Sequence, residues 1–162
     1  MQIRSETSVD IARVHALNVD AFNQSAEADL VDMLRASDDA IISLVAEDDG
    51  DIVGHVMFSK LVTPPRCLAL APVAVAPDHQ KEGIGTALIK RGLTMAKASR
   101  WRAVFVLGDP AYYTRFGFRV EDAAKFETPY PKEYMMAREL MPGALKAMDG
   151  ALTYAAPFSA FD

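Results

Sequence analysis

The stretch PDHQKEGIGTALIKRGLTMAK, residues 77–97, decides how the rest of the chain is interpreted. An apolar run ends at Pro77, a polar turn follows, and Gly83-Ile84-Gly85 opens a segment whose apolar residues recur at helical spacing. The first backbone N–H groups of a helix have no partner within it and lie at the positive end of its dipole. A strand, a loop of small residues and a helix N-terminus, in this order, predict an anion-binding site.

The segments on either side extend this unit. The apolar run at residues 67–76 (CLALAPVAVA) predicts a strand, and the continuous apolar run at 101–107 (WRAVFVL) is typical of a strand that is covered on both faces. With the helix between them they form a strand–helix–strand unit. This order predicts two parallel strands joined by a right-handed crossover.

The N-terminal part predicts two helices and an antiparallel hairpin. Thr7 or Ser8 is placed to cap the first helix. The turn Asp48-Asp49-Gly50-Asp51 lies between two runs of branched residues, a pattern typical of a hairpin. The predicted elements are a strand at 1–4, helices at 8–22 and 26–36, and strands at 41–47 and 52–62.

The C-terminal part predicts shorter elements. Gly108-Asp109-Pro110 leads into a short helix, after which Gly117-Phe118 restarts an extended segment. The predicted elements are a helix at 111–116, a strand at 133–140, a helical turn at 142–148 and a strand at 151–155. Because no repeat, low-complexity segment or linker interrupts the chain, residues 1–162 are expected to form a single α/β (α+β) domain.

The amino-acid composition argues against several classes of protein. The 162 residues are 51% apolar and 24% charged, as in ordinary globular domains. A balance of 17 basic and 22 acidic residues, net −5, argues against a general nucleic-acid or membrane-surface binder. Cys67 is the single cysteine, the first residues lack a signal-peptide pattern, and no apolar run approaches the ~20 residues that span a bilayer. These features predict a cytoplasmic protein.

The glycine loop does not fit the common nucleotide motifs. A P-loop needs GxxxxGK[ST], and a dinucleotide fold needs GxGxxG followed by an acidic residue. A tight turn that only packs the helix against its strand is the structural alternative. The pattern present is V-x-V-x-P-x-x-Q-x-x-G-x-G-x-x-L, with Val73, Val75, Pro77, Gln80, Gly83, Gly85 and Leu88 at its defined positions.

At these residues the chain closely resembles the GNAT superfamily of acetyl-CoA-dependent N-acetyltransferases. The resemblance implies a mixed, mostly antiparallel sheet with a splayed parallel strand pair, flanked by helices. It also implies that loop amides wrap the diphosphate of coenzyme A, with Lys81 adding charge and Glu82 pointing away. The implied cradle is Gln80, Lys81, Glu82, Gly83, Ile84, Gly85 and Thr86.

The resemblance gives the preceding strand a second role. In the family, the pantetheine arm of the coenzyme lies in the gap between the splayed strands as if it were an extra strand. The matching backbone is that of Val73, Ala74 and Val75. The physical idea is sound, because two pantetheine amides can pair with backbone groups that a splay leaves open. A plain core strand is the structural alternative.

A second motif lies in LGDPAYYTRFGF, residues 107–118, a string that resembles the YhbS-like branch of predicted acetyltransferases. Tyr113, Gly117 and Phe118 match the family's Y-x-x-x-G-F, so Tyr113 is the implied general acid. A phenol of pKa about 10 can protonate a thiolate whose conjugate acid lies near 8.5 to 10. Tyr112 and Asp109 are implied coenzyme contacts. Helix packing of the tyrosines, and capping of a short helix by Asp109, are the structural alternatives.

The chain departs from the family pattern at the general base. Many relatives carry a Glu on the strand before the loop, whereas residues 67–76 contain no carboxylate. An ammonium acceptor must lose a proton before attack, so either it arrives with a low pKa, or water relays the proton, or a residue elsewhere acts. Glu47, Asp48 and His55 are the candidates for that residue, although a single His in an apolar strand is more often a core residue.

Other reactive residues give weaker signals. His15, His55, His79 and Cys67 show no metal-ligand spacing, so no metal is expected. Cys67 as a nucleophile is a weak alternative, since buried thiols are usually inert. The basic residues of the central helix and its end are interpreted as a solvated face, with contact to the coenzyme's 3′-phosphate as the alternative; they are Lys90, Arg91, Lys97, Arg100 and Arg102.

These observations predict direct transfer of an acetyl group from acetyl-CoA to a primary amine of a small molecule or peptide. The acceptor pocket is expected between residues 20–34 and the tail from Tyr130 onward. A non-catalytic acyl-CoA sensor on the same fold is the alternative, motivated by the missing strand carboxylate. A structural domain without coenzyme affinity is a third interpretation. Dimers are common in the family, so the sequence leaves a homodimer open.

Overall fold

The computed structural model describes residues 1–161. Its six strands form one sheet and follow one another in chain order across it. The strands are β1 (Gln2–Ser5), β2 (Ala40–Asp48), β3 (Asp51–Lys60), β4 (Cys67–Val75), β5 (Ala103–Leu107) and β6 (Met135–Glu139). Neighbours are antiparallel except β4 and β5, which are parallel. The predicted mixed sheet with one parallel pair is confirmed.

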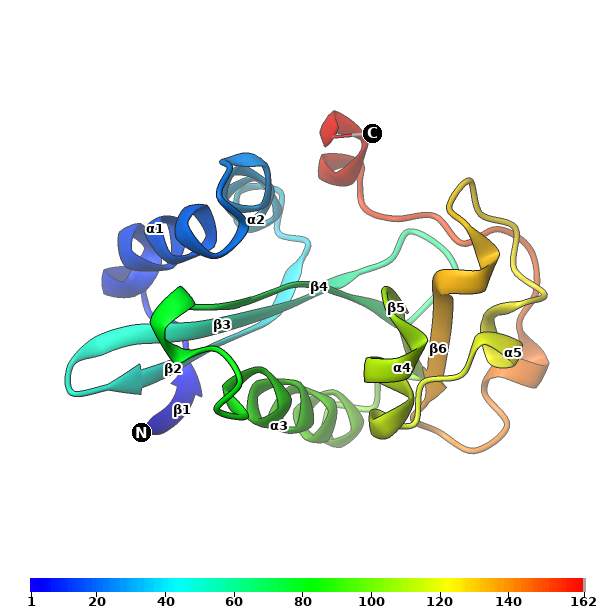
Figure 1. Cartoon of the computed structure of the whole chain (residues 1–162). Helices are drawn as coiled ribbons and strands as arrows, with labels where there is room; N and C mark the ends of the chain where they lie inside the picture. The colour runs from blue at the N-terminus through cyan, green and yellow to red at the C-terminus, as the bar shows by residue number, and fades with distance from the viewer. Residues whose placement is uncertain (162) are drawn as a thin grey trace.

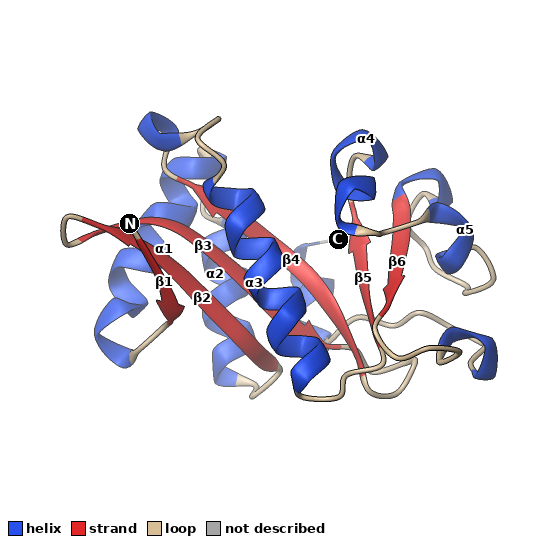
Figure 2. Cartoon of the chain, turned by 90° about the horizontal axis from the view of Figure 1, so that it is seen from below, coloured by secondary structure: helices blue, strands red, loops and turns tan. Residues whose placement is uncertain are grey.

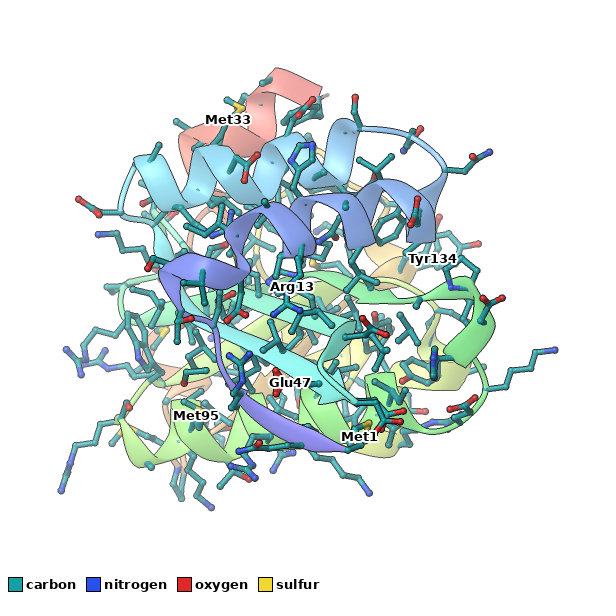
Figure 3. All side chains as sticks on the ribbon, turned by 90° about the vertical axis from the view of Figure 1, so that its left-hand side faces the viewer. Met1, Arg13, Met33, Glu47, Met95 and Tyr134 are labelled. Carbon is teal, nitrogen blue, oxygen red and sulfur yellow. The ribbon has the colours of Figure 1, made fainter. Side chains whose placement is uncertain are left out.

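Helices cover both faces of this sheet (Figure 1). The pair α1 (Ile11–Phe22) and α2 (Ala26–Ala36) lies on one face, and α3 (Ile84–Ala98) lies on the other. Figure 3 shows the same layers from the side, with the sheet between the helix pair and α3. The shorter helices are α4 (Pro110–Tyr113) and α5 (Val120–Ala123), with 3-10 turns at Ser8–Asp10, Pro77–His79, Thr114–Phe116, Lys132–Tyr134, Leu145–Ala147 and Ala156–Phe161. None of the helices in residues 1–161 is long and apolar enough to cross a membrane.

The alternation of side chains along the strands divides the core between the two faces. On the α3 face, Phe58 and Leu88 belong to a buried cluster that also includes residues of β2, β4, β5 and β6. The opposite face holds two clusters, one under α1 and α2 and one under the tail. Gly92 lets α3 lie directly on Phe58, since a Cβ there would stand 2.2 Å from the phenyl ring.

The parallel pair separates soon after it forms. Cys67, Leu68 and Ala69 pair with residues 103–105 of β5, and no further β4–β5 pairs follow in the described chain. A bulge opposite Met57 also interrupts the pairing of β4 with β3, where Pro72 has no N–H to donate. Figure 2 shows β4 and β5 meeting at one end and diverging toward the other.

Several C-terminal predictions need correction. The strand predicted at 151–155 is wrong, because Ala151 and Thr153 form only isolated bridges, to Glu127 and Thr63. The extended segment after Gly117 is a single bridge at Arg119, followed at once by α5, which the sequence analysis missed. These segments pack through side chains and isolated hydrogen bonds, which leave no periodic pattern in the sequence.

The N-terminus is fixed by a buried carboxylate. Asp10 is fully buried and accepts two hydrogen bonds from Arg4, of 2.7 and 3.0 Å, and a third from the backbone of Thr7 at 2.8 Å. Hydrogen bonds from Arg4 are the main reason that the pKa of Asp10 lies well below its usual range. Arg4 also contacts Glu47, so one guanidinium joins β1 to the start of the first helix and to β2.

We predict that Gly92→Ala destabilises the protein by about 1–3 kcal/mol, because the added methyl overpacks Phe58. Alanine would normally stabilise a helix interior relative to glycine by about 1 kcal/mol, so the sign of the change is diagnostic. Urea unfolding measures it. The exposed neighbour gives a matched control, since Arg91→Ala should stay within about 0.5 kcal/mol of the parent. A Gly92→Ala variant more stable than the parent would contradict this packing.

We also predict that Asp10→Asn lowers stability in a pH-dependent way. Because the pKa of Asp10 is depressed in the folded state, its contribution is present above the unfolded pKa of about 4 and is lost as the pH falls below it. Urea midpoints of the parent and the variant should therefore differ most at neutral pH and converge in acid. A difference that does not change with pH would show that Asp10 does not act through its charge.

Candidate active site

The edge of β4 that faces β5 carries backbone groups without a partner in β5. The Ala76 N–H donates to the Val53 carbonyl at 2.9 Å, which identifies Val53 and Ala76 as a hydrogen-bonded pair. Hydrogen-bonded and non-hydrogen-bonded pairs alternate along antiparallel strands. The backbone N–H and C=O of Ala74 therefore point to β3, whereas those of Val73 and Val75 point to the gap between β4 and β5. Two of the three expected pantetheine contacts therefore face the gap, and the backbone of Ala74 does not.

The expected diphosphate loop ends at the start of α3, as predicted. Gly83 is the N-cap and has φ +85°, a left-handed conformation that favours glycine. No side chain caps the helix. The first intrahelical bond runs from Ala87 N to Gly83 O at 3.0 Å. The N–H groups of Ile84, Gly85 and Thr86 are thus left for a ligand.

A hollow of about 410 Å³ lies at this helix end and gathers most of the expected cradle. It is lined by Val75, His79, Gln80, Lys81, Gly83, Ile84, Gly85, Thr86, Tyr112 and Arg115. Val73 lies beside it, since its Cγ1 would stand 3.7 Å from a Cβ at Gly85. His79 and Arg115 are the two lining residues that the sequence had not indicated as coenzyme contacts.

Three expected contacts have other partners in the structure. The Gln80 side chain donates to the Val75 carbonyl at 3.3 Å. Glu82 is exposed, lies 3.4 Å from His79 Nδ1 and does not line the hollow, as expected of a carboxylate near a diphosphate. Asp109 accepts from the Ala111 N–H at 3.0 Å and caps α4, which fits the structural alternative given for it.

Tyr112 joins the second motif to the loop. Its hydroxyl lies 3.1 Å from Thr86 Oγ1, and its ring stacks under the Arg115 guanidinium at 4.5 Å. Arg115 Nε also donates to the Tyr112 carbonyl at 2.9 Å. A hydroxyl and a cation from the α4 turn therefore reach the same hollow as the loop amides. The sequence could have indicated Arg115 as a lining residue, because it lies in the second motif, about one helical turn after Tyr112.

Tyr113 occupies a different environment. Its ring packs on Gly108, where a Cβ would stand 2.5 Å from Cε2, and lies edge-on to Phe118 at 6.0 Å. Within residues 1–161 no group hydrogen-bonds its hydroxyl. Burial raises the pKa of Tyr113 to about 12, with the neighbouring Tyr112 as a smaller cause. The phenol is therefore protonated across the physiological range and is a weaker acid than the sequence analysis assumed.

The other reactive candidates lie away from this site or are inaccessible. His55 is fully buried between Asn18 (3.3 Å) and Ser43 (2.9 Å), and burial, with a smaller effect of Arg35, lowers its pKa to about 3. Glu47 and Asp48 end β2, two strands from β4, and Figure 3 labels Glu47 beside the edge strand β1. None of these three faces the β4–β5 gap.

The environment of Cys67 makes its thiol unreactive. It is fully buried, its Sγ lies 3.9 Å from Met148 Sδ, and burial raises its pKa to about 11. A thiol in this environment has neither the access nor the thiolate character of a nucleophile.

One group of side chains was not anticipated as a potential metal site. His15, Asp29 and Asp32 have ligand atoms within 4.8 Å of one another on the outer helices. Asp32 already pairs with His15 at 2.8 Å and with Arg35 at 2.7 Å. Asp32 is thus already engaged by a histidine and an arginine of the protein itself.

The two segments expected to enclose the acceptor lie side by side. Leu30 and Leu34 of α2 form one buried cluster with Ala155 of the tail, and Phe158 packs against it. Tyr154 links this region to Tyr130 through ring contacts at 4.9 and 5.4 Å. The tail therefore crosses the face of the sheet opposite α3 (Figure 1).

Comparison with known proteins identifies this arrangement. A family model described as the acetyltransferase (GNAT) family matches residues 11–118. The N-acetyltransferase YhbS of Escherichia coli (strain K12), described as uncharacterised, is 32% identical over 99% of this chain and 100% of its own length. YjhQ of Escherichia coli (strain K12), another N-acetyltransferase described as uncharacterised, is 35% identical over 75% of this chain and 72% of its own length.

Solved structures agree with the sequence matches. Escherichia coli YhbS in complex with CoA superposes with a TM-score of 0.92 at 31% identity, covering 99% of this chain and 93% of that one. A GNAT family acetyltransferase from Brucella melitensis in complex with acetyl-CoA gives 0.83 at 33% identity, covering 97% of each chain. With the splayed parallel pair and the glycine loop at the start of α3, these matches show that the chain belongs to the GNAT family of acetyltransferases.

Proposed function

We propose that this acetyltransferase moves the acetyl group of acetyl-CoA directly to a primary amine of a small molecule or peptide, in a ternary complex. The observation that carries the proposal is the open β4 edge beside the hollow at the start of α3. We further propose that the chain acts as one catalytic domain, which its single continuous sheet supports.

Two neighbouring features, the hollow at the start of α3 and the open edge of β4, fit coenzyme A as the carrier of the acetyl group. Coenzyme A combines a diphosphate with an arm that contains two amides. The hollow offers free helix N–H groups and two cations, Lys81 and Arg115, to the diphosphate. Val73 and Val75 offer backbone donors and acceptors to the arm. CoA and acetyl-CoA in the structures of the two similar chains support this choice.

The chain's own groups can assist each step of the transfer. A backbone N–H of the open β4 edge polarises the thioester carbonyl. The amine nitrogen attacks that carbon, the C–N bond forms and the C–S bond breaks. Tyr113 gives its proton to the departing sulfur, and the surplus proton on nitrogen then restores the phenol. A phenol of raised pKa favours this recovery, because its anion is a strong base.

We predict that Gly83→Ala weakens coenzyme binding. A side chain at φ +85° costs about 1–2 kcal/mol and shifts the loop, so the Kd for CoA, measured by calorimetry, should rise about tenfold. Gly50 is the matched control, because it has φ +84°, equally open surroundings and a place in the β2–β3 turn. Gly50→Ala should lose similar stability and keep the parent Kd. Equal Kd values for both variants would contradict the role of the loop.

We predict that Tyr113→Phe lowers kcat about 100-fold and leaves the Kd for CoA nearly unchanged, because the phenyl ring keeps its packing on Gly108. Release of free thiol over a panel of primary amines measures turnover. Tyr112→Phe provides the comparison, since it removes the hydroxyl near Thr86 and should raise the Kd instead. An unchanged kcat with a verified acceptor would remove Tyr113 from the mechanism. Coenzyme binding without thiol release from the parent protein would favour the non-catalytic alternative.

A further inference from the structure

The end of β5 exposes apolar surface on the face of the sheet opposite α3. Side chains alternate along this strand, with Phe105 in the buried cluster under the tail and Val106 in the cluster under α3. Leu107, the last residue of β5, therefore points to the tail side, and it is 39% exposed. It lies beyond the part of β5 that pairs with β4, so its side chain borders the gap between the two strands.

The apolar surface continues from Leu107 across β6 into the tail. Leu107 is paired with Met135, whose Sδ lies 3.9 Å from the Tyr154 hydroxyl. The Tyr154 ring lies edge-on to Tyr130 at 5.4 Å and to Phe158 at 4.9 Å. Phe158 packs in turn on the cluster under α1 and α2. These five residues form an apolar belt from the end of β5 to α2, along the path that the tail takes in Figure 1.

The belt begins one residue from the proposed acid. Gly108 follows Leu107, and the Tyr113 ring packs on it. The Gly108 N–H also donates to the Tyr134 carbonyl at 3.0 Å, which joins this turn to the segment before β6. A molecule whose amine attacks at the gap between β4 and β5 therefore has the belt beside it on the face opposite α3.

The chemistry of the belt limits the acceptors that it suits. None of its five residues is ionised at neutral pH, and burial, with a smaller effect of Tyr130, raises the pKa of Tyr154 above its usual range. Such a surface favours apolar groups that leave water and rings that stack on its own. A second ammonium placed there would lose its hydration and find no carboxylate in the belt.

We propose that the acceptor is a small monoamine with an aromatic or apolar body, and that Leu107 and Tyr154 contact this body while the amine reaches the thioester at the gap between β4 and β5. This inference rests on the proposed function, since it names the acceptor class of the same site. Leu107 offers a partly exposed contact, whereas Tyr154 is fixed by the rings on either side of it.

The test measures kcat/KM by thiol release at saturating acetyl-CoA for three primary amines, with rates expressed per concentration of unprotonated amine. The parent protein should use 2-phenylethylamine about tenfold or more better than propylamine, because binding removes the phenyl ring from water. It should also use 2-phenylethylamine better than 1,4-diaminobutane, whose second ammonium has no partner in the belt.

Variants of the belt locate this preference. Leu107→Ser should lower kcat/KM for 2-phenylethylamine about tenfold and leave the value for propylamine and the Kd for CoA nearly unchanged. Tyr154→Leu should act in the same direction, whereas Tyr154→Phe keeps the ring and should keep the preference. Ile41→Ser is the matched control, because Ile41 is 38% exposed on β2, two strands from β4, and its loss should change none of these values.

The outcomes separate this inference from the proposed function. Equal kcat/KM for 2-phenylethylamine and propylamine in the parent would overturn the inference, although acetyl transfer to amines would stand. Preferred use of 1,4-diaminobutane would overturn it in the same way. A loss in Ile41→Ser equal to that in Leu107→Ser would show that the preference does not come from contact with the belt. Coenzyme binding without thiol release from any of the three amines would contradict the proposed function and the inference together.

Discussion

The separation of β4 from β5 is the constraint on which the rest of the structure depends. The two strands share three residue pairs, and beyond Ala69 the β5-facing groups of Val73 and Val75 have no strand partner. Unpaired backbone at the centre of a sheet is costly unless another group satisfies it. The splay therefore needs a wedge that holds it open and partners other than a strand for these groups, such as the Gln80 side chain that donates to the Val75 carbonyl. Helix α3 and the α4 turn, which pack across the gap at Gly85, Tyr112 and Tyr113, supply the wedge.

The charge around this gap is opposite in sign to the net charge of the whole chain. The chain carries net −5, yet residues 84–119 contain a single acidic residue, Asp109, against seven basic ones. Those basic residues are Lys90, Arg91, Lys97, Arg100, Arg102, Arg115 and Arg119. The acidic excess therefore belongs to the rest of the chain. An anionic donor and an acidic protein are compatible because the field near a site depends on its nearest charges, whereas salt largely screens exposed charges more than about 10 Å away.

The opposite face of the sheet is closed by segments from the two ends of the chain. The α1–α2 pair is anchored at its start by the Arg4–Asp10 contact, and the tail is tied to the β3–β4 connection by the hydrogen bonds of Thr63 with Ala151 and Thr153. Their side chains meet around Leu34 and Phe158. The surfaces expected to contact the acceptor thus come from parts of the chain more than a hundred residues apart, and their local sequence carries no shared motif.

Local patterns in the sequence could predict the order of the elements around the donor site, the parallel pair and the loop at the start of α3. These features were predictable because a glycine-rich turn, helical periodicity and apolar strand runs each involve neighbouring residues. The backbone groups that face the gap could be identified only in the folded sheet, since the orientation of Val73 relative to Ala74 follows from pairing with β3. The fold also brought the Tyr112 hydroxyl to Thr86 and Arg115 to the same hollow, and left Tyr113 out of it. These residues are distant in sequence. Packing of the whole core brings them together, and short sequence patterns do not indicate such contacts.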